Sequence, residues 1–268
     1  MPDRDSMSHA RDHDRAAARR LALLWGLQPW SGRKSRSDLS IEKIVGSAIE
    51  TADAEGLGAL SMRRVAERLG VGTMSLYTYV PGKEELIDLM LDAVYGDMAR
   101  PAERPAHWRA RLEEVARENW LLARRHPWVL ELSTIRPPLG PNAVAKYDYE
   151  LAAVDGIGLS DIEMDSVVEL VTGHVERVAR RRLDATRVER DSGMTDEQWW
   201  ELNGPLVRNV FDETRFPVAA RVGVVAGEAH GAAYSPEHAF EFGLRCVLDG
   251  IEALVAQRRD ATESEGSA

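Results

Sequence analysis

The 268-residue sequence contains a single cysteine, Cys246, and no run of apolar residues approaching the 18 or so that a membrane span needs. One cysteine cannot form a disulfide within the chain or build a cysteine-rich metal site, so a reducing cytoplasm is the expected compartment. We expect no membrane partner. The short apolar stretch at 21–27 follows arginines, as in a signal peptide, but no small-residue cleavage site comes after it.

Signatures of catalysis are also missing. The sequence has no HExxH, GxSxG or phosphate-loop motif and no paired-carboxylate constellation. The glycines at every fourth position in 221–234 have no preceding strand, so a weak helix or a mobile loop is expected there. His174 and Glu176 are two residues apart and point to different sides of a helix, which argues against a metal site. We expect no cofactor and no metal, and an α-helical enzyme is the least favoured function.

The net charge of −10 argues against a nucleic-acid partner until its distribution is considered. Residues 1–83 carry 13 Lys or Arg against 10 Asp or Glu, a net charge of +3. Residues 84–268 carry 21 against 34, a net charge of −13. A basic head on an acidic body suits a protein that presents one end to a polyanion and repels it with the other.

Apolar residues recur at helical spacing along most of the chain. No hairpin signal and no alternation of strands with helices interrupts them, which predicts an all-α fold. Capping residues and breakers bound the expected helices, which cover 40–55, 61–69, 73–79, 83–98, 108–125, 127–135, 142–154, 162–183, 195–213 and 237–257.

The stretch 62–81 has the pattern of two helices joined by a tight turn. Val65, Leu69 and Leu76 are spaced to pack the two helices together, and Gly70 permits a left-handed backbone between them. Two such helices form the DNA-binding helix-turn-helix, whose second helix lies in the major groove. An ordinary helical hairpin with a polar face fits the same pattern.

The sequence GVGTMSLYTYV at 70–80 gathers hydroxyl and phenol side chains that a core would not accept. Exposed Ser and Thr can bond base edges or phosphates, and Met can contact a thymine methyl group. Tyr77 and Lys83 are placed for phosphate oxygens, which position a protein without reading sequence. The side chains left to face base edges are Thr73, Met74, Ser75, Thr78 and Tyr79.

Residues 39–91 resemble the N-terminal domain of the TetR family of bacterial transcriptional regulators. The resemblance rests on the first helix ending in AEG, on LSMRRVAERLGV, on SLYTYV in the recognition helix and on the GKEEL start of the next helix. It implies an all-α homodimer with a DNA-binding head and a ligand-binding, dimerising body. It also implies a regulator, usually a repressor, and assigns DNA contact to Arg63 besides the residues above.

This resemblance divides the chain into a flexible basic extension at 1–37, a three-helix DNA-binding domain at 38–85, a larger helical domain at 86–258 and a disordered tail at 259–268. Within the extension, GRKSR supplies Arg33, Lys34 and Arg36, which would lie along the minor groove as basic arms do. A solvated linker is the alternative. Trp25 is expected to pack the preceding short helix onto the head.

The body resembles the C-terminal domain of tetracycline repressors in its helix pattern and in the TIRPP sequence. The pocket histidines and asparagine of those repressors find no matching positions, so tetracycline is not expected. Aromatic and polar side chains together suit a flat or apolar ligand, although packing in the core is an alternative for each tryptophan. The candidate ligand-binding residues are Asn119, Trp120, Trp128, Tyr147, His174 and Arg177.

The helices at 162–183 and 237–257 carry the strongest apolar stripes, and Gly243 and Gly250 permit close approach. We expect this pair to form a homodimer, because paired heads read paired half-sites of a DNA operator. Packing within one chain is the alternative. A DNA-binding protein without a small-molecule effector, architectural or controlled by another protein, is the alternative to a ligand-responsive regulator.

Overall fold

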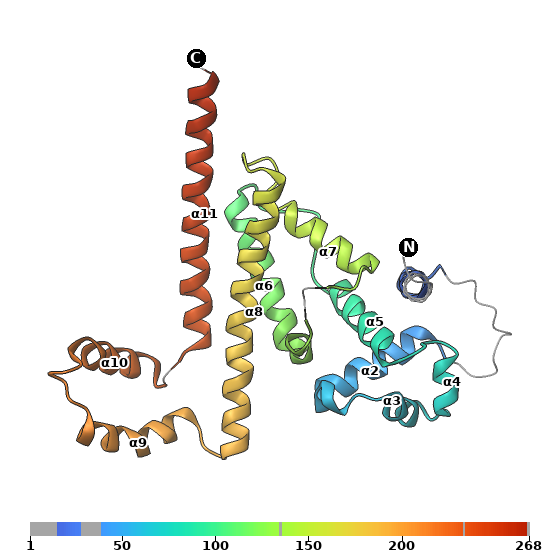
Figure 1. Cartoon of the computed structure of the whole chain (residues 1–268), viewed down its shortest axis with the longest axis horizontal. Helices are drawn as coiled ribbons and strands as arrows, with labels where there is room; N and C mark the ends of the chain where they lie inside the picture. Colours follow the sequence, from blue (N-terminus) through green and yellow to red (C-terminus); the bar gives the residue numbers. More distant parts are fainter. Residues whose placement is uncertain (1–14, 28–38, 134–135, 233, 267–268) are drawn as a thin grey trace, which may run out of the picture. The chain divides into compact units, whose positions relative to one another are not determined.

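The computed structural model describes residues 15–27, 39–133, 136–232 and 234–266 (Figure 1). These residues form helices and connecting turns without any strand, as the sequence predicts. None of the helices in these ranges is long and apolar enough to cross a membrane. The contacts divide the chain into two compact units, Met1–Ile157 and Gly158–Ala268.

The first unit contains the head. Helices α2 (Ile41–Glu55), α3 (Met62–Leu69), α4 (Thr73–Tyr77) and α5 (Lys83–Gly96) pack around a common apolar core, and a short 3-10 turn, η1 (Leu57–Ala59), joins α2 to α3. Ser40 and Ser61 cap α2 and α3 with their side-chain oxygens, as the sequence predicts for such positions.

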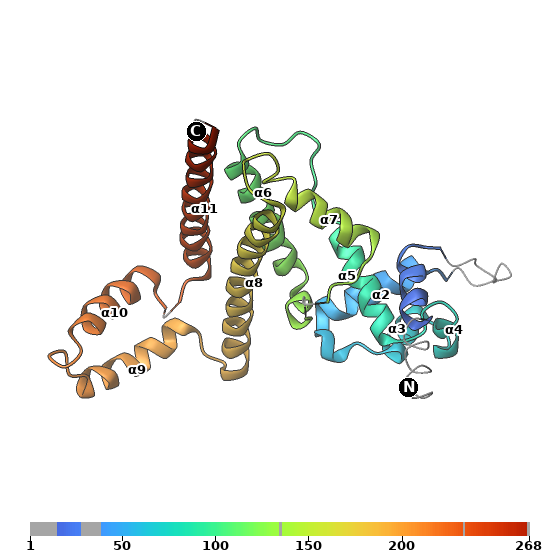
Figure 2. The same cartoon turned by 45° about the horizontal axis from the view of Figure 1, so that its top comes forward.

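A further helix, over residues 15–24, belongs to the same core. Leu23 and Leu24 are buried and join the apolar cluster of the head. Figure 2 shows this helix in dark blue, close to α2 and α5. The sequence predicts a short helix here that packs onto the head, and Leu23 and Leu24 are the side chains that it buries.

The first unit continues into α6 (Trp108–Arg125), the 3-10 segment η2 (Pro127–Glu131) and α7 (Pro141–Leu151). Asp53 of α2 holds the end of α6: its carboxylate lies 2.9 Å from the Nδ1 of His126 and accepts the indole N–H of Trp128 at 2.8 Å. Packing thus continues from the head through α7, so these helices belong to the same compact unit.

In the second unit, α8 (Asp161–Ser192) and α11 (Pro236–Gly266) lie side by side (Figures 1 and 2). The buried His174 of α8 packs against Gly243, where a Cβ atom would lie 2.2 Å from the imidazole, and its Nε2 lies 3.1 Å from the Phe240 carbonyl oxygen. Burial lowers the pKa of His174 below its ordinary value of 6.5, so the ring is neutral at pH 7.

Helices α9 (Asp196–Val210) and α10 (Pro217–His230) connect α8 to α11, and neither buries a side chain. The glycine-spaced stretch at 221–234 is thus largely helical, which agrees with the expectation of a weak helix rather than a mobile loop. Helix α8 runs to Ser192, nine residues beyond its predicted end, because the arginine-rich continuation lacks apolar periodicity yet contains no breaker before Gly193.

Candidate DNA-binding surface and effector pocket

The turn between α3 and α4 has the geometry that the sequence predicts. Gly70 adopts φ of 66° and ψ of 29°, the left-handed region, and its N–H reaches the carbonyls of Ala66 and Glu67. The N–H of Val71 donates to the Ala66 carbonyl at 3.0 Å. Val65, Ala66 and Leu76 are almost fully buried and hold α3 and α4 together. The two helices therefore form a packed helix-turn-helix.

The outer face of α4 is polar and open. Met74 is 79% exposed and Tyr77 is 44% exposed, whereas Leu76 between them is fully buried. Ser75 is exposed and Thr73 is half-buried at the start of the helix. An exposed methionine between hydroxyl side chains has no packing partner in the head, which fits a surface that contacts another molecule.

Thr78 and Tyr79 are less available for contact with DNA than Ser75 and Met74. The Thr78 hydroxyl donates to the Ser75 carbonyl, and Tyr79 is half-buried against the core of the head. Direct base contact is therefore best supported for the first turn of α4, which is the end that a recognition helix presents to base edges.

Lys83 is exposed in the first turn of α5. A cation is unfavourable there, because the N-terminal end of the helix dipole is positive. Gly82 provides no side-chain cap, and Glu84 and Glu85 place acidic groups in the same turn. The lysine side chain is therefore the group of this turn that would meet a phosphate. This position suits a backbone contact beside α4.

Arg63, the remaining predicted contact on the head, is 83% exposed and donates to Glu67 at 2.8 Å. Glu67 raises the pKa of Arg63, which is charged in any case. The other arginines of α3 are paired as well, Arg64 with Glu55 and Arg68 with Glu50. The predicted contacts Arg33, Lys34 and Arg36 lie outside the described residues.

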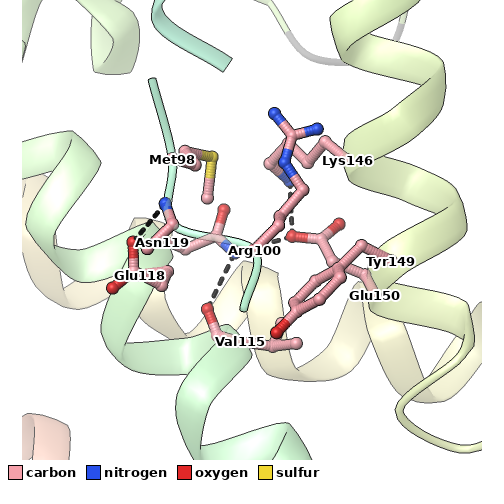
Figure 3. A pocket seen from close by; sticks show the side chains of 9 residues that line it. Met98, Arg100, Val115, Glu118, Asn119, Lys146, Tyr149 and Glu150 are labelled. Atoms are coloured by element: carbon pink, nitrogen blue, oxygen red, sulfur yellow. Dashed lines mark hydrogen bonds and ion pairs between the residues drawn. The ribbon is translucent and has the colours of Figure 1, made fainter. Parts of the chain in front are cut away.

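A pocket opens between the end of α5, α6 and α7, and Figure 3 shows the side chains that line it. Its cavity volume is about 10 Å³, room for about one water molecule and far below the roughly 300–1,000 Å³ of typical small-molecule sites. The lining residues are Met98, Ala99, Arg100, Val115, Glu118, Asn119, Lys146, Tyr149 and Glu150.

The polar groups of this pocket are connected (Figure 3). The carboxylate of the buried Glu150 accepts hydrogen bonds from Lys146 Nζ at 2.6 Å and from Asn119 Nδ2 at 2.7 Å. Glu118 accepts the backbone N–H of Ala99 at 3.0 Å. Lys146 and Glu150 thus neutralise each other, whereas Glu118 is bonded to a backbone N–H and Arg100 donates to the Tyr95 carbonyl oxygen.

Among the predicted ligand-binding residues, only Asn119 lines this pocket. Trp128 is 1% exposed and belongs to the core of the head, Trp120 is buried in α6, and Tyr147 is exposed on α7. His174 and Arg177 lie on α8 in the second unit. Within the first unit, Trp120, Trp128 and Tyr147 thus lie outside the lining that contains Asn119.

The sequence interpretation missed Lys146 and Glu150, which hold the centre of the pocket. Their spacing of four residues, with Asn119 on a neighbouring helix, was the available signal, but such a pair is typical of exposed helix surfaces. Only the burial of Glu150 distinguishes it. In the described parts of the chain, no group of three or more His, Cys, Asp or Glu side chains is arranged to hold a metal ion.

Comparison with known protein families gives two matches. Residues 44–90 match the family described as bacterial regulatory proteins, tetR family. Residues 100–255 match the tetracyclin repressor-like C-terminal domain. Together these matches cover both the helix-turn-helix and the helices that follow it.

Individual relatives agree with these matches. The chain is 44% identical over 247 residues to the HTH-type transcriptional repressor DrrR1 of Streptomyces coeruleorubidus, covering 90% of this chain and 88% of that protein. Apo ActR of Streptomyces coelicolor is similar in structure, with a TM-score of 0.67, 27% identity and coverage of 85% of this chain and all of ActR. ActR in complex with actinorhodin also gives 0.67, at 27% identity over 81% of this chain and 97% of ActR.

Proposed function

The chain belongs to the TetR family of bacterial regulatory proteins, and from this we propose that it is a repressor that binds a palindromic operator as a dimer and is released by a small molecule. The observation that carries the proposal is the packed helix-turn-helix with an open polar face on α4. The relative DrrR1 is named a transcriptional repressor, which supports the sign of regulation.

Two kinds of contact are expected at the operator. Thr73 and Ser75 begin α4 and would meet base edges, whereas Lys83 would bind phosphate. Thr73→Ala or Ser75→Ala should change base preference, at about 1–3 kcal/mol for a good contact. Lys83→Ala should weaken binding to all sequences alike and reduce the salt slope by about 1.

Selection from randomised DNA, followed by affinity measurements at two salt concentrations, tests this division of roles. Glu84→Ala is the matched control, because Glu84 is exposed beside Lys83 and carries the opposite charge. The assignment is wrong if Lys83→Ala alters sequence preference while Thr73→Ala and Ser75→Ala do not. Failure of the unmodified protein to enrich any sequence would contradict operator binding itself.

For the effector we propose a small, largely apolar or aromatic compound that binds the pocket between α6 and α7. Met98, Val115 and Tyr149 give the pocket apolar and aromatic surface, and the structure of the relative ActR holds actinorhodin. Because the cavity is smaller than most ligand sites, a compound of that size must spread α6 and α7 apart. Spreading would alter α5 through the segment that follows it, because Met98, Ala99 and Arg100 line the pocket directly after the helix ends.

Actinorhodin is a suitable first probe, followed by a panel of aromatic compounds. A true effector should quench tryptophan fluorescence and lower operator affinity together. To lower operator affinity 100-fold, the ligand must bind the released state more favourably than the DNA-bound state by about 2.7 kcal/mol. Tyr149→Ala, which removes an aromatic side chain from the pocket wall, should weaken both effects and leave operator binding without ligand intact. If ligands bind the pocket tightly and operator affinity does not change, then the proposed link between ligand binding and DNA release is wrong.

The proposed dimer forms through the exposed sides of α8 and α11. Both helices run the length of the second unit, and each leaves large apolar side chains uncovered, Leu170 on α8 and Phe242 on α11. Such exposed apolar groups on a long helix pair suit a subunit interface. Two heads held in this way would address the two halves of a palindrome.

A further inference from the structure

Three elements of the first unit meet at one place: the N-terminal helix over 15–24, the middle of α5 and the start of α7. We call the contacts among Arg20, Trp25, Asp88, Asp92 and the chain at Leu139–Ala143 the clasp. Each contact is polar, and each joins segments far apart in the sequence. The family resemblance, which begins at residue 39, says nothing about the first of these elements.

The first side of the clasp joins the N-terminal helix to α5. The guanidinium of Arg20 is hydrogen-bonded and ion-paired to the carboxylate of Asp88, which is 8% exposed. Leu23 and Leu24, on the following turn, are buried in the core of the head. A buried carboxylate without its cation would be costly, so this ion pair fixes where the N-terminal helix docks.

The second side joins α5 to the start of α7. Asp92 follows Asp88 by one helical turn and therefore lies on the same face of α5. Its Oδ1 accepts the backbone N–H groups of Asn142 and Ala143 at 3.1 and 2.9 Å, and its Oδ2 accepts the Asn142 amide at 3.1 Å. A carboxylate of α5 thus acts as the N-terminal cap of α7.

Gly140 shows how close this approach is. Its φ is an ordinary −82°, so the backbone does not demand glycine. A Cβ atom at this position would nevertheless lie 2.2 Å from Asp92 Oδ1. Since Asp92 is held by three hydrogen bonds, it cannot swing aside, and any larger residue must push α5 and α7 apart.

The third side of the clasp joins the N-terminal helix to the start of α7. Directly after the N-terminal helix, the indole N–H of Trp25 donates to the Leu139 carbonyl at 2.8 Å, one residue before Gly140. The N-terminal helix therefore holds α5 through Arg20 and the start of α7 through Trp25. Neither contact is needed for the helix-turn-helix itself, which is packed by other residues.

We propose that Arg20 and Trp25 are positioning residues for operator binding, and that they act by holding α7 against α5. Helix α5 begins at Lys83, with five residues between it and the end of α4, so its placement sets the direction of the recognition helix. Helix α7 carries Lys146, Tyr149 and Glu150 of the pocket. The inference rests on the proposed function, because it assigns a role in operator binding.

Hydrogen exchange on the protein without DNA tests the clasp itself. Trp25→Phe keeps an aromatic ring and removes only the N–H donor, and Arg20→Gln removes the charge. Both should speed exchange of the Asn142 and Ala143 amides by about 3–10-fold, the loss expected for one hydrogen bond. Gly140→Ala should speed it further. Leu27→Ala, at a side chain 71% exposed, is the control and should change nothing.

Operator spacing tests the positioning role, which a merely structural contact would not affect. The protein first selects its palindrome from randomised DNA, and spacers one base pair shorter and longer are then compared. Trp25→Phe should reduce the preference for the selected spacer by about 3–10-fold, from the same hydrogen-bond loss, while affinity for a single half-site stays unchanged.

The outcomes separate the two proposals. Unchanged exchange at Asn142 and Ala143 in both Trp25→Phe and Arg20→Gln would overturn the clasp. Faster exchange with an unaltered spacer preference would overturn the positioning role and leave the repressor proposal standing. Absence of any selected DNA would overturn the repressor proposal and the positioning role together, whatever the exchange experiment gives.

Discussion

Glutamate at Phe242 or at Leu170 is expected to turn the protein into monomers and to weaken operator binding by about 10²–10⁴-fold. These side chains are 52% and 53% exposed within one chain, so the substitution disturbs little of the subunit's own core. In the proposed dimer each would bury an unpaired charge. Operator affinity then falls because the second head no longer binds as an intramolecular event.

Sedimentation and operator titration measure the two effects separately. Val188→Glu is the matched control: Val188 is 61% exposed on the same α8, but it lies beyond the end of the helix pair marked by the Arg182–Glu237 ion pair. A wild-type protein that sediments as a monomer, or a dimer indifferent to both glutamates, would remove the basis for the proposed interface.

Glutamate at Leu248 should act differently, by unfolding the second unit. Leu248 is 1% exposed and packs between α11 and α8 inside one chain. Charge burial there costs several kcal/mol, a large part of the 5–15 kcal/mol that stabilises a typical domain. Denaturant unfolding followed by the loss of helical circular dichroism should show the lower stability.

Leu248→Met is the matched control and should cost less than about 1.5 kcal/mol, because it conserves volume. The comparison with Phe242→Glu is informative, since both glutamates stand on α11. If Leu248→Glu produced folded monomers with an unchanged unfolding midpoint, then Leu248 would face a partner rather than α8, and the intrachain packing described above would be wrong.

Most of the head could be predicted from the sequence because its signals are local. Ser61 and Gly70 bound α3, and the apolar spacing of Val65, Leu69 and Leu76 defines how the two helices pack. Capping chemistry and helical periodicity act over a few residues. The exposed face of α4 follows directly, since the side chains left over must point outward.

The parts that the sequence did not reveal depend on distant partners. Trp128 was a candidate ligand residue, but its indole donates to Asp53, 75 positions away, in the core of the head. The N-terminal helix has only a short apolar stripe, and what secures it is Asp88 on α5. The spacing of residues along the chain does not show which distant residues will pair. From the sequence, a tryptophan in the core therefore cannot be told from one that lines a pocket.

The helices of the body could be predicted from the sequence, but the residues of its pocket could not. Lys146 and Glu150 resemble an ordinary surface pair, and only the fold buries the carboxylate beside Asn119. Conversely, His174 was a candidate ligand-binding residue, and the structure packs it against Gly243. Burial decides between these roles, and burial is a property of the packed helices rather than of the local sequence.

The paired arginines of α3 bear on how the protein travels along a chromosome. Arg63, Arg64 and Arg68 each face a glutamate, so a phosphate must replace a carboxylate partner instead of meeting a bare cation. Random DNA offers only phosphate contacts and therefore holds such a surface weakly. Brief residence on wrong sequences shortens the search for the operator, and the dissociation rate from non-operator DNA at increasing salt measures this residence directly.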